Sequence, residues 1–114
     1  MLNLFHFPAI KGYVRHLSRN CGAGGAGGFQ RMHPVGTGVE KCQSLCDELP
    51  FGKGKNHCSC IMVRGNGQCY LLDGLTDGGC NIKQCPDQGP TKDVYVRIKP
   101  GMCNANNISI SYVA

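Results

Sequence analysis

The chain has 114 residues, nine of them cysteine and none tryptophan, so we expect one small domain whose core needs disulfide support. Structural disulfides imply an oxidising compartment, and no run of residues approaches the roughly 18–20 apolar residues that a membrane helix needs. The net charge of +5 comes mainly from residues 1–39, which contain no acid. These few basic residues lie away from the expected core and form no dense cluster, which excludes a typical nucleic-acid-binding protein.

We do not expect the N-terminal residues to form a secretory signal. MLNLFHFPAI has no basic region, and its apolar run is interrupted by Asn3, His6 and Pro8. Residues 1–20 are free of acid and contain arginine, which is typical of an organelle transit peptide. We therefore expect either the extracellular space or cell surface, or the lumen of an organelle such as the plastid thylakoid.

A glycine-rich stretch follows. Seven glycines fall between Gly22 and Gly38, which predicts a loop, held in place if Cys21 is disulfide-bonded. A phosphate-binding loop is disfavoured because CGAGGAGGF lacks the Gly-Lys-Ser/Thr ending and the flanking strand and helix.

A short helix is predicted next. Thr37-Gly38-Val39-Glu40 matches a capping box, and Pro50 ends the segment. The apolar stripe of this helix consists of Val39, Cys42, Leu45, Cys46 and Leu49. Cys42 and Cys46 lie on one face, from which two disulfides would fasten the helix to whatever lies beneath it.

The rest of the chain predicts strands. Residues 58–64 and 68–73 form a hairpin around Gly65-Asn66-Gly67, and residues 93–98 form a closing strand. In the closing strand Val94, Val96 and Ile98 share one face, and Tyr95 and Arg97 share the other. Residues 99–114 form a tail that alternates weakly and is a candidate for one more strand.

These motifs together resemble the PAN/apple module. The resemblance rests on Cys42-x3-Cys46, on Cys58-Ser-Cys60-Ile61 and on Cys69-Tyr70-Leu71. Asn20-Cys21 and the following glycine pairs are similar to the opening of a PAN-like variant in multi-module proteins of single-celled algae, and residues 93–97 to its closing strand. The resemblance covers residues 13–98, with residues 1–12 as an extension and 99–114 as the tail.

The resemblance implies an α+β fold: one short helix on a twisted antiparallel sheet with long glycine-rich loops. It also implies the disulfides Cys42–Cys69 and Cys46–Cys58. Cys60 stands where the family usually has a small residue, on the same strand face as Cys58, so the partner of Cys46 stays open between the two. We expect further bridges from Cys21, Cys80 and Cys85, and because nine is odd, one free or intermolecular thiol, for which Cys103 is the candidate.

Zinc binding is a weaker alternative for the same cysteines. Cys-x3-Cys and Cys-x-Cys with His57 supply enough ligands, but one pair lies on a helix and the other along a strand, and neither forms a knuckle turn. A catalytic cysteine is disfavoured because no thiol is singled out and the histidines are scattered. We therefore expect no enzyme activity, no cofactor and no metal.

The resemblance implies a non-catalytic module for protein–protein or protein–carbohydrate recognition, as in adhesion. Candidate contacts are Arg64 and Asn66 at the hairpin and Tyr95 and Arg97 on the closing strand, although ordinary solvent-facing strand residues would look the same. Asn107 begins a glycosylation sequon. The alternative function is a structural subunit of a large assembly, such as the lumenal side of an algal photosynthetic membrane complex, in keeping with the transit-like N-terminus.

Overall fold

The computed structural model describes residues 12–21, 28, 30–76, 82–85 and 92–98. They form the predicted α+β domain, in which one helix packs on a five-stranded antiparallel sheet with three disulfides. The N-terminal extension, the tail with its candidate strand, Cys80, Cys103 and Asn107 lie outside the described residues.

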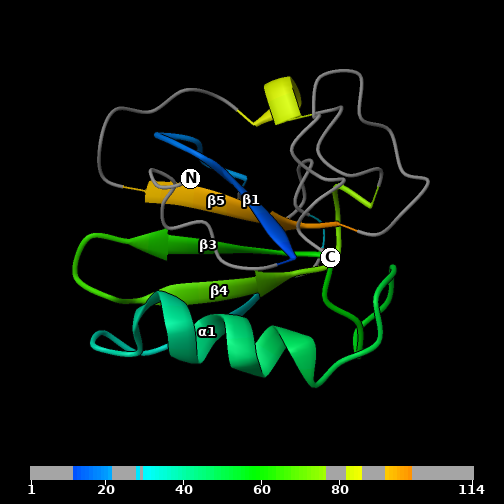
Figure 1. Ribbon diagram of the computed structural model, residues 1–114, viewed down its shortest axis with the longest axis horizontal. Helices are drawn as coiled ribbons and strands as arrows, with labels where there is room; N and C mark the ends of the chain where they lie inside the picture. Colours follow the sequence, from blue (N-terminus) through cyan, green and yellow to red (C-terminus); the bar gives the residue numbers. More distant parts are fainter. Residues whose placement is uncertain (1–11, 22–27, 29, 77–81, 86–91, 99–114) are drawn as a thin grey trace, which may run out of the picture.

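The sheet has the strand order β1-β5-β3-β4-β2 (Figure 1). Its strands are β1 (Tyr13–His16), β2 (Gln30–His33), β3 (Cys60–Arg64), β4 (Cys69–Leu72) and β5 (Lys92–Arg97). The predicted hairpin is β3–β4 at the centre of the sheet, and the predicted closing strand is β5. The turn between β3 and β4 closes through the Gly67 N–H, which donates to the Arg64 carbonyl at 2.9 Å, with Gly67 at φ 89°.

The two edge strands were not predicted. β2 lies inside the stretch Gly22–Gly38 that we expected to be a loop, so that expectation is wrong for residues 30–33. The sequence QRMH has no run of β-branched or aromatic residues and no apolar alternation. Its strand conformation depends on backbone pairing with β4, in which Met32 lies opposite Tyr70.

Helix α1 (Gly38–Asp47) lies alongside β3 and β4, as Figure 1 shows, and buries Cys42 and Cys46. The predicted capping box is wrong: Thr37 has helical φ and ψ, and its hydroxyl donates to the Pro34 carbonyl at 2.6 Å. The start of the helix is held by the hairpin turn, because the Gly38 N–H donates to the Gly67 carbonyl at 2.9 Å. No helix among the described residues is long and apolar enough to cross a membrane.

Both faces of the sheet are buried. On the helix side the core consists of Tyr13, Ile61, Val63, Leu71 and Tyr95 with the cysteines of α1 and their partners. On the opposite side it consists of Met62, Tyr70, Leu72, Val94 and Val96 with Cys21, Cys60, Cys85 and Leu75. The predicted alternation of β5 is confirmed, and each of its faces packs against a separate small core.

A buried carboxylate explains one glycine of the glycine-rich stretch. Asp73 follows β4, is 9% exposed, and its Oδ2 accepts the Gly54 N–H at 2.7 Å. Gly28 has φ +80°, and a Cβ at this position would lie 2.1 Å from Asp73 Oδ1. A side chain at position 28 would therefore have to displace the carboxylate that holds the 51–57 segment to the sheet.

We expect Gly28→Ala to lower the free energy of unfolding by about 3 kcal/mol, because it combines a strained φ with a clash against Asp73. Gly36→Ala is the matched control, since Gly36 has φ +91° but nothing within 4 Å of its added Cβ. The control should lose only about 1 kcal/mol. Denaturant unfolding of both variants measures this difference, and equal losses would contradict the role given to Asp73.

Candidate functional site

Three disulfides are present among the described cysteines. Cys42–Cys69 and Cys46–Cys58 join α1 to the central hairpin and to the segment that leads into it, in the pairing that the resemblance implied. Cys21–Cys85 joins two loops over the other face of the sheet, as expected for two of the three remaining loop cysteines. These bonds support an oxidising compartment.

Cys60 was expected to be a structural disulfide cysteine, and this is wrong, because its thiol is free and fully buried. The expectation assumed that Cys58 and Cys60 share a strand face. In the structure β3 begins at Cys60, and Cys58 belongs to the helix-side core whereas Cys60 packs in the opposite core. Cys46 therefore pairs with Cys58 alone, and burial raises the pKa of the Cys60 thiol to about 12.

We expect Cys60 to resist alkylation in the native protein at neutral pH, since the thiolate is the reactive form and its pKa is about 12. Because the pKa is raised, the rate of alkylation should increase only as the pH rises towards that value or when the protein unfolds. Mass spectrometry of the peptide that contains Cys60, after labelling under native and denaturing conditions, tests this. Comparable labelling in both conditions would contradict the buried position.

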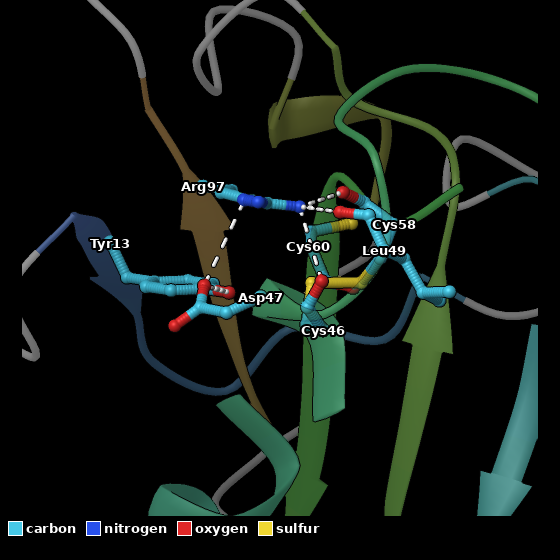
Figure 2. A network of polar contacts seen from close by, with 7 residues as sticks. All are labelled: Tyr13, Cys46, Asp47, Leu49, Cys58, Cys60 and Arg97. Carbon is cyan, nitrogen blue, oxygen red and sulfur yellow. Dashed lines mark hydrogen bonds and ion pairs between the residues drawn. A yellow bond between two sulfur atoms is a disulfide. The ribbon is translucent and has the colours of Figure 1, made fainter. Parts of the chain in front are cut away.

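Arg97 connects the end of α1 to the sheet (Figure 2). Its Nη1 donates to the carbonyls of Leu49 and Cys58, both at 2.9 Å, and to that of Cys46 at 3.2 Å. The last turn of α1 has no basic residue of its own, and carbonyls at a helix C-terminus need donors and favour a cation. Arg97, which lies on β5, supplies both the hydrogen-bond donor and the positive charge.

Asp47 completes this network. Its Oδ1 accepts a hydrogen bond from the Tyr13 hydroxyl at 2.8 Å and lies 3.8 Å from Arg97 Nε. Burial, together with the hydrogen bond to Asp47, raises the pKa of Tyr13 well above its usual value. The phenol is therefore a fixed donor, and Tyr13, Asp47 and Arg97 join β1, α1 and β5, as Figure 2 shows.

Two of the four predicted contact residues are thus not free surface groups. Tyr95 is only 4% exposed, and the Arg15 guanidinium lies over its ring at 5.7 Å. The side chain of Arg97 is 19% exposed and is used within the fold. Strand alternation placed both residues on one face correctly, but that face belongs to the helix-side core, and the Arg15 side chain from the neighbouring strand β1 lies over Tyr95.

We expect Arg97→Met to lower the free energy of unfolding by about 3 kcal/mol, because it leaves three backbone carbonyls without their shared donor. Arg15→Met is the control, since it removes the same charge from a partly exposed ion pair with Asp93 (2.8 Å) and should cost about 0–1 kcal/mol. Denaturant unfolding compares the two. A loss no larger than that of the control would mean that Arg97 does not hold the helix end.

The other two predicted residues lie at the tip of the central hairpin. Asn66 is exposed; its Oδ1 accepts the Gln68 N–H at 3.0 Å, and its carbonyl accepts the Gly36 N–H at 3.0 Å. Arg64 Nη1 donates to Gln68 Oε1 at 3.1 Å. The contact between Gly36 and Asn66 holds the hairpin turn against the turn that precedes α1, and the two contacts of Gln68 lie within the hairpin.

The same end of the molecule carries two exposed apolar side chains that were not predicted as contacts. Met32 on β2 is 57% exposed, and Val35 in the following turn is 61% exposed. We call Met32, Val35, Arg64 and Asn66 the hairpin-tip surface. The missed signal was Met32 and Val35 themselves, apolar residues inside a segment predicted to be a loop.

Most of the cysteines considered as zinc ligands are disulfide-bonded in this structure. Three of its cysteines, Cys42, Cys46 and Cys58, are in disulfides, so their thiolates are not available. In the part of the chain that the structure describes, no group of three or more His, Cys, Asp or Glu side chains could hold a metal ion. Among the histidines, His16 is half-buried. Its burial lowers its pKa, and the positive charge of Arg19 lowers it further.

Comparisons with models of protein families, with curated proteins and with solved structures found no match to this chain.

Proposed function

We propose that this chain is a non-catalytic recognition module that binds a protein or a carbohydrate in an oxidising compartment, with a PAN/apple-like fold. The observation that carries the proposal is the fastening of a ten-residue helix to the central hairpin segment by Cys42–Cys69 and Cys46–Cys58. The resemblance implied this same pairing. For its location we favour the extracellular space or the cell surface, where such modules serve adhesion.

The hairpin-tip surface is our choice for the binding site. Both faces of the sheet are buried in the described domain, which leaves loops and turns as contact surfaces. Met32 and Val35 offer apolar area, and Arg64 and Asn66 offer polar groups beside it. Backbone hydrogen bonds from Gly36 to Asn66 and from Gly38 to Gly67 fix the turns, which lowers the entropy lost on binding.

The test is to produce the full chain with its disulfides intact and to measure binding to a glycan array and to a panel of purified cell-surface proteins. For each protein or uncharged glycan that binds, we expect the double variant Val35→Ser, Arg64→Ala to weaken binding roughly tenfold or more. The matched control is Leu17→Ser, Lys83→Ala, which removes an exposed apolar group that follows β1, at the sheet edge opposite β2, and an exposed cation on the 3₁₀ turn Ile82–Gln84.

The control variant should bind like the native chain. A folded chain that binds nothing in either panel would overturn the recognition function. Equal weakening by both variants would leave the function standing but would remove the binding site from the hairpin tip.

A further inference from the structure

The segment 51–57 joins α1 to β3 at the end of the central hairpin away from its turn. Its sequence, FGKGKNH, has two lysines, no acid, and a glycine before each lysine. Lys53, Lys55 and Asn56 are exposed. Gly52 and Gly54 have φ of +137° and +124°, a conformation that favours glycine.

This segment is held at several points. The Cys58 N–H donates to the Pro50 carbonyl at 3.0 Å and closes its base, and the His57 N–H donates to the Gly54 carbonyl at 3.0 Å. Gly54 is also bound to Asp73 (2.7 Å), and the Cys46–Cys58 disulfide anchors the returning chain. The backbone that presents the two lysines is therefore fixed before any ligand arrives.

A third cation joins the lysines from the edge of the sheet. Arg31 on β2 donates through Nη2 to the Lys55 carbonyl, which places its guanidinium against the segment. We call Arg31, Lys53 and Lys55 the basic loop cluster. Its three positive charges come from two parts of the chain that are 22 residues or more apart, and the fold brings them together.

The acids near this cluster do not cancel its charge. Asp73 faces inward and is 9% exposed, and Asp47 is used by Tyr13 and Arg97. Glu48, exposed beside the end of α1, is the nearest remaining acid in the sequence. Because Asp47 lies beside Arg97, two carboxylates, those of Glu48 and the buried Asp73, stand against the three cations of the cluster.

We propose that the basic loop cluster binds an acidic polysaccharide, one that carries sulfate or carboxylate groups along its chain. Lysine and arginine pair with such anions, and the two glycines leave backbone without side chains beside the lysines, where a sugar ring can approach closely. The Asn56 amide is available for sugar hydroxyls. Disulfides support an oxidising compartment, in keeping with the extracellular location favoured above.

The test uses the full disulfide-bonded chain with dextran sulfate and with neutral dextran, two polymers that differ only in charge. We expect binding to dextran sulfate that weakens as salt is added, and no binding to neutral dextran. Lys53→Gln, Lys55→Gln should weaken binding roughly tenfold or more. The matched control Lys41→Gln, Lys83→Gln removes the same charge from exposed positions on α1 and on the short 3₁₀ turn Ile82–Gln84, and should change binding less than about threefold.

Equal weakening by both pairs would overturn the site, because binding would then follow net charge alone. Equally tight binding of polyglutamate would overturn the choice of a polysaccharide. Far-ultraviolet circular dichroism and thermal unfolding verify that both pairs fold. The hairpin-tip variant Val35→Ser, Arg64→Ala should retain binding to dextran sulfate, so failure here and failure of the proposed recognition function are separate results.

Discussion

The position of helix α1 depends on how its last turn is fastened. A helix of ten residues is marginal on its own, and its final carbonyls need donors. Two links fasten this turn: the Cys46–Cys58 disulfide is a covalent bond, and the Arg97 guanidinium is a charged hydrogen-bond donor. Because Arg97 comes from β5 and Cys58 lies two residues before β3, this junction joins the helix to two neighbouring strands. The segment 51–57 leaves and re-enters the fold there, so these contacts hold its two ends, and Asp73 holds Gly54 between them.

The two cores are thin, and covalent or polar links complete them. Without tryptophan, each sheet face buries only one or two aromatic side chains besides aliphatic residues and cysteines. Cys42–Cys69 secures the helix layer, and Cys21–Cys85 secures the loops on the opposite face. Asp73 adds a buried carboxylate that holds Gly54. With both faces closed, loops and hairpin ends remain exposed, which is why the two proposed surfaces are built around the two ends of the central hairpin.

Much of the candidate site could not be read from residue patterns. Alternation in β5 identifies which side chains share a face, but not whether another element covers that face; Tyr95 is buried for this reason. Arg97 looked like a surface cation because its partners are backbone carbonyls, which no sequence pattern records. Arg31 likewise meets Lys55 only through strand pairing at the sheet edge. Charges that gather across distant segments depend on topology.

The sequence by itself determined the helix, the central hairpin, the closing strand and the need for disulfides, because each follows from local periodicity, turn residues or composition. The tertiary structure decided the two edge strands, whose conformation depends on backbone pairing with partners far along the chain. It also left Cys60 free, because the strand begins there and turns that side chain away from Cys46. Local pattern specifies the helix and the three inner strands, whereas long-range pairing and packing decide the edge strands and which side chains meet.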